Sequence, residues 1–159
     1  MVNLLDLTRD FPEIALSAGE TFLSKGDTSD KLFVLAEGAV EVHRDGVTIA
    51  TVTEPGSVFG EMSILLGIPH TADVRAATNA KLRHIENAID HLAKNPALAL
   101  PIAQLLARRL QNSTTYLVDL KKQFRNKADH FSMVDQVLES LANQQDEEFT
   151  PDDDLPSEP

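Results

Sequence analysis

The stretch from Phe59 to Ala76, FGEMSILLGIPHTADVRA, holds the residues of this chain best suited to bind a ligand. Gly60 stands beside an acid, Glu61, and a short apolar helical turn follows before a Gly–Pro loop. Glycine lets the backbone come close to a ligand, and N–H groups at a helix start can face an anion. A carboxylate there would repel phosphate unless it served another donor, such as a sugar hydroxyl. The stretch is one way to build a phosphate pocket.

Patterns of catalysis or metal binding are missing from the sequence. Ser63 stands in G-E-M-S-I and not in the G-x-S-x-G of a hydrolase, and no Walker loop or dinucleotide fingerprint occurs. The chain has no cysteine, which excludes disulfides, thiolate catalysis and zinc–thiolate sites. Its scattered histidines lack the spacing of metal ligands: His43, His70, His84, His91 and His130. We therefore expect a protein that is not an enzyme, with no catalytic residues, metal or cofactor.

The charge balance restricts the partners. The formal net charge is −11, whereas binding to a nucleic-acid backbone needs a basic face. No run approaches the ~18–20 apolar residues of a membrane span. The first residues, MVNLLDLTRDFPEI, carry acids and do not resemble a signal peptide. We expect a cytoplasmic protein that binds neither nucleic acid nor membrane.

Short strands between turns are predicted for the first half of the chain, where all seven glycines fall, between Gly19 and Gly67. Asp45-Gly46 is a hairpin-type turn. Alternating or continuous apolar runs predict strands over residues 32–36, 39–43, 47–52, 72–77 and 80–85. Turns every ~8–12 residues indicate a small antiparallel sandwich or roll.

Helices are predicted after Asn87. A short helix is expected over residues 88–94, and a long one from near Pro101 with no further proline or glycine until Pro151. Residues at alternating spacings of four and three form a coiled-coil seam. They are Leu106, Leu110, Ser113, Leu117, Leu120, Phe124, Lys127, Phe131, Val134, Leu138 and Leu141. The seam predicts a homodimer through residues 102–124. The alternative is one amphipathic helix, broken near 126–129 and folded back on its own roll; beyond Asn126 both stay open.

The tail over residues 145–159 holds seven acids, no base and three prolines, so we expect it to be disordered. Such a tail either recruits a basic protein partner or keeps the chain soluble. We expect a domain over 1–95, a dimerisation helix or helices over 96–144, and then this tail.

Residues 59–76 resemble the phosphate-binding cassette of the cyclic nucleotide-binding domains, F-G-E-[LIM]-[AS]-L-L-x-x-x-P-R-[STA]-A-[TD]-V-x-A. The resemblance spans about residues 11–125 and includes AGETFLSKGDTSDKLFVLAEGAVEV upstream and NPALALPIAQLLARRLQ downstream. It implies a fold that is mostly β with α: an antiparallel β-roll (double-stranded β-helix) followed by a long C-terminal helix. After Asn126 too few helical residues remain for the winged DNA-binding domain of some members.

The resemblance also implies roles for single residues. Glu61 would accept a hydrogen bond from the ribose 2′-hydroxyl, with the backbone of Gly60 and Met62 shaping that contact. Thr71 would offer its hydroxyl or N–H, and Ala72 its N–H, to the cyclic phosphate. ARRLQNST over 107–114 resembles the dimer helix of family members, which implies that Ser113 and Thr114 face the base, one of them from the neighbouring subunit.

His70 departs from the family, which has arginine at this position. Arginine holds two phosphate oxygens with a permanently charged fork, whereas histidine offers one donor and is charged only part of the time. The lost contact costs ~1.5–3 kcal/mol, or ~10- to 150-fold in affinity. The substitution indicates either a weaker site or one that no longer binds. The first alternative is a sensor for a cyclic nucleotide, cAMP rather than cGMP; the second is a dimeric protein-interaction scaffold.

Removal of the seam tests the expected dimer. A chain truncated after Ser113 should sediment as a monomer, because most of the apolar seam is gone. Truncation after Gln144 removes only the acidic tail and should leave the dimer intact. A dimer that persists in the shorter chain would refute the helix seam.

Overall fold

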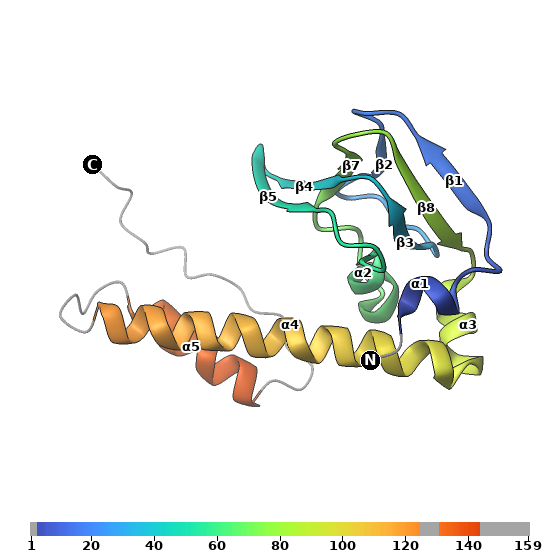
Figure 1. Ribbon diagram of the computed structural model, residues 1–159. Coiled ribbons are helices and arrows are strands. Elements are labelled where there is room, and N and C mark those ends of the chain that lie inside the picture. Colours follow the sequence, from blue (N-terminus) through green and yellow to red (C-terminus); the bar gives the residue numbers. More distant parts are fainter. Residues whose placement is uncertain (1–2, 125–130, 144–159) are drawn as a thin grey trace. The chain divides into compact units, whose positions relative to one another are not determined.

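The structure, a computed structural model, describes residues 3–124 and 131–143 (Figure 1). The chain divides into two compact units after Gln104. Its elements follow in the order α1 (Leu4–Leu7), β1 (Glu13–Leu16), β2 (Thr21–Leu23), β3 (Leu32–Glu37), β4 (Val40–Arg44), β5 (Val47–Val52), β6 (Val58–Phe59), α2 (Glu61–Leu66), β7 (Asp73–Ala76), β8 (Ala80–Ile85), α3 (Ala88–Lys94), α4 (Pro96–Gln123) and α5 (Phe131–Asn143).

Two four-stranded sheets form the first unit (Figure 1). The strand order is β1-β8-β3-β6 in one sheet and β2-β7-β4-β5 in the other, and every pairing is antiparallel. The predicted fold is confirmed: an antiparallel β-roll is followed by the long helix α4.

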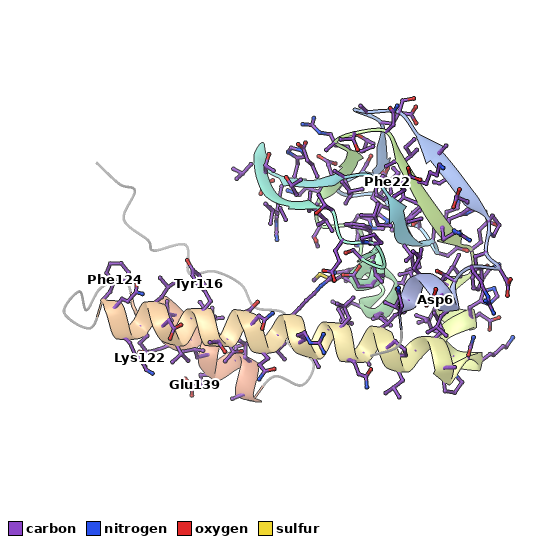
Figure 2. The ribbon with its side chains drawn as sticks, in the orientation of Figure 1. Asp6, Phe22, Tyr116, Lys122, Phe124 and Glu139 are labelled. Atoms are coloured by element: carbon purple, nitrogen blue, oxygen red, sulfur yellow. The ribbon has the colours of Figure 1, made fainter. Side chains whose placement is uncertain are left out.

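Both sheets contribute to one apolar core. Its buried members are Leu23, Phe33, Leu35, Val40, Phe59, Val74 and Leu82. Phe22 of β2, which is labelled in Figure 2, packs edge-on against Phe33 and Phe59, with ring centroids 5.1 Å and 5.9 Å apart. Such pairs contribute about 0.5–1.5 kcal/mol beyond the area they bury. Phe59 therefore anchors the strand that leads into the predicted phosphate pocket.

The chain changes sheet at Gly38, between β3 and β4. Gly38 has a φ of +95°, and a Cβ atom there would lie 2.4 Å from the carbonyl oxygen of Asn79. Ala39 accepts a hydrogen bond from the N–H of Ala77 at 2.8 Å. The β3–β4 and β7–β8 corners thus touch, and only glycine fits at their contact.

The predicted turn at Asp45-Gly46 is confirmed. Both residues have positive φ, 52° and 79°, and the flanking Arg44 and Val47 pair across the hairpin. Two successive left-handed residues are the geometry of a type I′ turn, whose twist matches that of two antiparallel strands.

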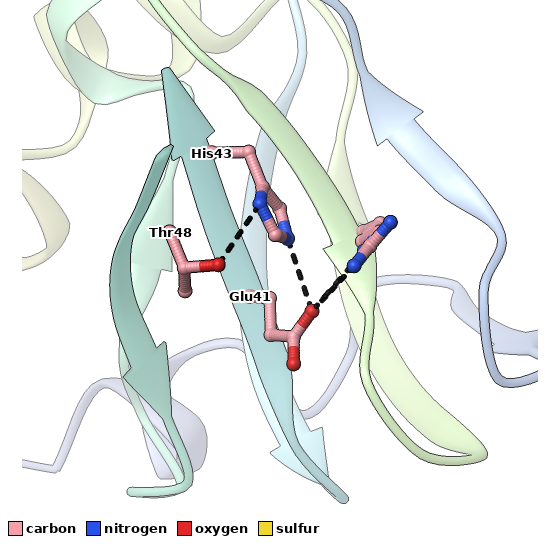
Figure 3. A network of polar contacts seen from close by, with 4 residues as sticks. Glu41, His43 and Thr48 are labelled. Carbon is pink, nitrogen blue, oxygen red and sulfur yellow. Dashed lines mark hydrogen bonds and ion pairs between the residues drawn. The ribbon is translucent and has the colours of Figure 1, made fainter. Parts of the chain in front are cut away.

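A polar network on β4, β5 and β7 ties these strands together (Figure 3). His43 Nε2 lies 3.0 Å from the Glu41 carboxylate, and Thr48 Oγ1 lies 3.2 Å from His43 Nδ1. Arg75 of β7 donates from Nε and Nη2 to the same Glu41 oxygen, at 3.1 Å and 3.0 Å. The hydrogen bonds from His43 and then Arg75 hold the pKa of Glu41 below its ordinary value. The network fixes β7, the strand that ends the predicted pocket.

The short helix predicted over 88–94 is confirmed as α3, but the predicted start of the long helix is wrong. Helix α4 begins at Pro96, where the N–H groups of Leu98 and Ala99 donate to the carbonyl of Asn95 at 3.0 Å and 3.1 Å. Pro96 takes the first helical position, where its missing N–H costs nothing. Pro101 lies inside the helix.

One continuous helix through the whole seam is excluded. Helix α4 ends at Gln123 and α5 begins at Phe131. Lys121 of α4 forms an ion pair with Asp135 of α5. In a straight helix these residues, 14 positions apart, would be separated by about 21 Å, so α4 and α5 are not parts of one straight helix. Residues 125–130, where the alternative placed a break, lie outside the described part.

The expectations about membrane spans and about the acidic tail are tested only for the residues that the structure describes. None of the helices in the described residues is long and apolar enough to cross a membrane. The acidic tail over 145–159 lies outside the described residues, so its predicted disorder stays a prediction.

The sheet corner gives a stability prediction. Gly38→Ala should lower the free energy of unfolding by about 3 kcal/mol or more, because left-handed strain of ~1–2 kcal/mol adds to a clash with a backbone carbonyl. Urea denaturation measures the loss. Gly46→Ala is the matched control: its φ is also positive, but a Cβ atom there meets nothing within 4 Å. Equal losses in the two variants would show that the corner contact is unimportant.

The Glu41 network gives a pH prediction. Because the folded pKa of Glu41 is lowered, its stabilisation is complete above the unfolded value of about 4.5 and is lost as pH falls through the folded value. Glu41→Gln should therefore be less stable than the parent at pH 7, and the difference should shrink below pH 4.5. Urea unfolding across pH measures this. In Glu37→Gln, which removes an exposed ion pair with Lys81, the difference should stay small. A pH-independent difference for Glu41→Gln would contradict the network's role.

Candidate functional site

Buried polar side chains concentrate in the predicted cassette, residues 59–76. Among the described residues the buried polar side chains are Thr8, Glu61, Ser63 and His70. Three of these four fall within residues 61–70. Burying polar groups costs free energy unless they are hydrogen-bonded, so they gather where a structure needs them. The cassette is therefore the first place to seek a binding site.

The cassette begins at a close approach between two backbone segments. Gly60 has a φ of +89°, and a Cβ atom on it would lie 2.8 Å from the carbonyl oxygen of Lys31. Any other residue would be strained and would collide with that carbonyl. Gly60 thereby turns the chain from β6 into α2 directly beside the loop that precedes β3.

Glu61 follows at the first position of α2. Its side chain is 7% exposed, whereas the side chain of the next residue, Met62, is 51% exposed. A carboxylate so well buried is unusual for a residue that is mostly found at protein surfaces. Because the Met62 side chain faces outward, its predicted share in the site would come from its backbone.

Helix α2 is short and closes on itself. The hydroxyl of Ser63 donates to the carbonyl of Ile68, and the N–H of Gly67 donates to the carbonyl of Ser63 at 2.9 Å. Gly67 ends the helix with a φ of +67°. This turn brings His70 back to the start of the cassette, where its Cε1 lies 3.9 Å from the position of a Cβ on Gly60.

His70 is held by the β2–β3 loop, residues 24–31. Its N–H donates to the carbonyl of Asp27 and its carbonyl accepts from the N–H of Gly26, both at 2.8 Å. Its Nε2 lies 3.1 Å from the hydroxyl oxygen of Ser29, and the side chain is 7% exposed. The sequence analysis missed Ser29, because no local pattern links it to a residue 41 positions away.

The same loop also contacts the end of the cassette, where the N–H of Lys25 donates to the Asp73 carboxylate at 2.8 Å. The ammonium group of Lys25 pairs with Asp45 at the β4–β5 turn. That hydrogen bond holds the pKa of Asp45 below its ordinary value. Thr71 and Ala72, both half-buried, lie between His70 and β7.

The structure brings some of the predicted site residues together in the first unit, whereas two others belong to the second unit. Gly60, Glu61, Met62, His70, Thr71 and Ala72 belong to one continuous loop and helix whose two ends meet. Ser113 is exposed and Thr114 half-buried on α4, within the second unit. Their contact with a base stays a prediction.

Two other features are weaker candidates for a site. A hollow at the adjoining ends of β1, β3 and β8 is lined by Leu16, Glu37, Asn79 and Lys81 among others, but it includes no cassette residue and holds no buried polar side chain. No group of three potential metal ligands occurs in residues 3–124 and 131–143. The cassette is the stronger candidate.

Comparison with known sequences agrees with this geometry. The sequence profile described as "Cyclic nucleotide-binding domain" matches residues 13–89. A cGMP-dependent protein kinase of Caenorhabditis briggsae is 33% identical over 87 residues, which are 55% of this chain and 12% of the kinase. The chain thus spans only a small part of the length of such kinases.

Solved structures share the fold. The catabolite activator protein of Thermus thermophilus superposes with a TM-score of 0.62 at 28% identity, over 76% of this chain and 60% of that protein. The N-terminal domain of a transcriptional regulator from Streptomyces coelicolor has a TM-score of 0.51 and 32% identity, over 70% of this chain and 81% of that domain. Both similarities cover much more of the chain than the cassette alone.

Proposed function

The chain belongs to the family of cyclic nucleotide-binding domains, and we propose that it is a sensor that binds a cyclic mononucleotide, cAMP in preference to cGMP. The observation that carries the proposal is the buried Glu61, which follows the left-handed Gly60 and lies in the loop that His70 closes. A domain of this family is a regulatory unit and not a catalytic one.

In the proposed complex, one set of cassette residues binds the sugar and another set binds the phosphate. Glu61 accepts a hydrogen bond from the ribose 2′-hydroxyl, and the backbones of Gly60 and Met62 shape that contact. His70, Thr71 and Ala72 donate to the cyclic phosphate. A buried carboxylate suits a neutral hydroxyl donor, since it would repel an anion. The burial of Glu61 and the position of His70 beside Gly60 support this division.

The proposal extends to the helices after the roll. Ser113 and Thr114 would contact the base, one of them from the second subunit of a homodimer formed through residues 102–124. Two apolar residues that stay exposed, Leu110 on α4 at 47% and Phe124 directly after it at 42%, support a dimer surface. Nucleotide binding would shift the packing of the helix, because a ligand favours the state it binds more tightly. A protein partner bound to the C-terminal helix or to the acidic tail would respond to that change in helix packing. A cytoplasmic location is part of the same proposal and rests on composition.

One observation favours a second candidate, a dimeric scaffold that no longer binds nucleotide. His70 replaces the arginine of the family motif, and its Nε2 is already bonded to the Ser29 hydroxyl. A ring engaged by the protein itself has one nitrogen fewer to offer to a phosphate.

Nucleotide titration distinguishes the two candidates. Calorimetry with cAMP and cGMP should give saturable binding, with the tighter affinity for cAMP. His70→Arg should tighten binding by about 10- to 150-fold, because the fork of arginine restores a charged, two-oxygen contact.

A matched control is His91→Arg on α3, an exposed site outside the cassette that should leave affinity unchanged. If neither nucleotide produces heat or a thermal shift at millimolar concentration, the sensor is refuted and the scaffold remains. If His70→Arg binds no better than the parent, His70 does not face the phosphate.

A further inference from the structure

The β2–β3 loop determines how the His70 ring can be used. Two backbone hydrogen bonds fix the position of the histidine on the loop: the N–H of Gly26 donates to the His70 carbonyl, and the N–H of His70 donates to the Asp27 carbonyl. The ring is then free to rotate only about its own side-chain bonds, and its hydrogen bond to Ser29 restricts that rotation. The imidazole is therefore presented in one orientation.

The contact with Ser29 bears on the ring's proton position. Ser29 Oγ accepts a hydrogen bond from the N–H of Lys31 at 3.4 Å and lies 3.1 Å from Nε2 of His70. A hydroxyl donates one hydrogen bond and accepts two, so this contact fits either tautomer of the ring. Where Ser29 is the donor, Nε2 carries no proton and the proton of the neutral ring resides on Nδ1.

The hydrogen bond to Ser29 engages one ring nitrogen, Nε2, and leaves the other, Nδ1, for a ligand. Cε1, the ring carbon between the two nitrogens, lies 3.9 Å from the position of a Cβ on Gly60, at the start of the cassette.

We propose that Ser29 is a positioning residue of the nucleotide site: its hydroxyl holds Nε2 of His70 so that Nδ1–H donates to an oxygen of the cyclic phosphate. This inference rests on the proposed function and deepens it. With its proton on Nδ1, the neutral ring supplies a donor to the anion. Ser29 thus offsets part of the loss caused by the missing arginine.

Without the hydroxyl, nothing selects the Nδ1–H form. In the neutral ring Nδ1 can then be the acceptor, with a lone pair facing the phosphate oxygens. Removal of the hydroxyl should therefore weaken binding at pH 8, whereas a substitution that keeps a hydroxyl should not.

Other titratable groups lie on the segments packed against the ring. They are Asp27, Asp30 and Lys31 of the β2–β3 loop, Glu61 of α2 and Asp73 at the start of β7. All of them are present in the parent and in the Ser29 variants. Comparison of variants at the same pH therefore cancels their contribution to the first approximation.

The first experiment needs no ligand. In the ¹⁵N NMR spectrum of the full chain at pH 8, the His70 ring should show a protonated Nδ1 and an unprotonated Nε2. Ser29→Thr keeps the hydroxyl and should keep this signature, whereas Ser29→Ala should lose it. A protonated Nε2 in the parent at pH 8 would overturn the inference, whether or not a nucleotide binds.

The second experiment titrates the same proteins with cAMP and cGMP at pH 8. Ser29→Ala should bind about tenfold more weakly, with Ser29→Thr close to the parent. Thr28→Ala, at the exposed neighbouring hydroxyl, is the control and should match the parent. An unchanged affinity of Ser29→Ala, or an equal loss in Ser29→Thr, would overturn the positioning role. If no nucleotide binds while the NMR signature holds, the proposed function fails and the tautomer assignment stands.

Discussion

The contact between Gly60 and the carbonyl of Lys31 is the constraint on which the rest of the site depends. It brings the start of the cassette against the β2–β3 loop, and the same loop binds the cassette's end through His70 and Asp73. A ten-residue excursion through α2 is thus clamped at both ends by one loop. Because the clamp consists of backbone atoms on both sides at Gly60, no rotation of a side chain can relieve a substitution there.

The roll supplies rigid support for this clamp. The aromatic contacts of Phe22 fix Phe59 on the inner face, and the Glu41 network fixes β7 through Arg75. Apolar packing therefore holds the strand that enters the cassette, and a polar network holds the strand that leaves it. Between them lie buried polar groups that an ordinary core would exclude. The buried polar groups of such a site lie where a sugar phosphate would need hydrogen-bond donors and acceptors.

Local sequence patterns, such as turn signals and the alternation of apolar residues, predicted much of the fold correctly. Asp45-Gly46 defines a hairpin because only two left-handed residues make that turn, and the strands on either side follow from alternation. Local rules were wrong at Pro101, because a proline near the start of a long helix is compatible with two starting points and Asn95 provides the better one. They also left the seam beyond Phe124 undecided. A heptad pattern is the same whether a helix continues straight or reverses and packs on itself.

The sequence by itself determined the roll, the cassette within it and the replacement of arginine by His70, because each of these depends on residue types at short, fixed spacings. Only the tertiary structure decided that α4 and α5 are separate helices and that Ser29 meets the His70 ring. The physical reason is that such contacts join segments far apart in the chain. Which loops become neighbours is set by strand pairing across two sheets, and no local spacing encodes the direction in which a side chain from one loop meets a ring on another.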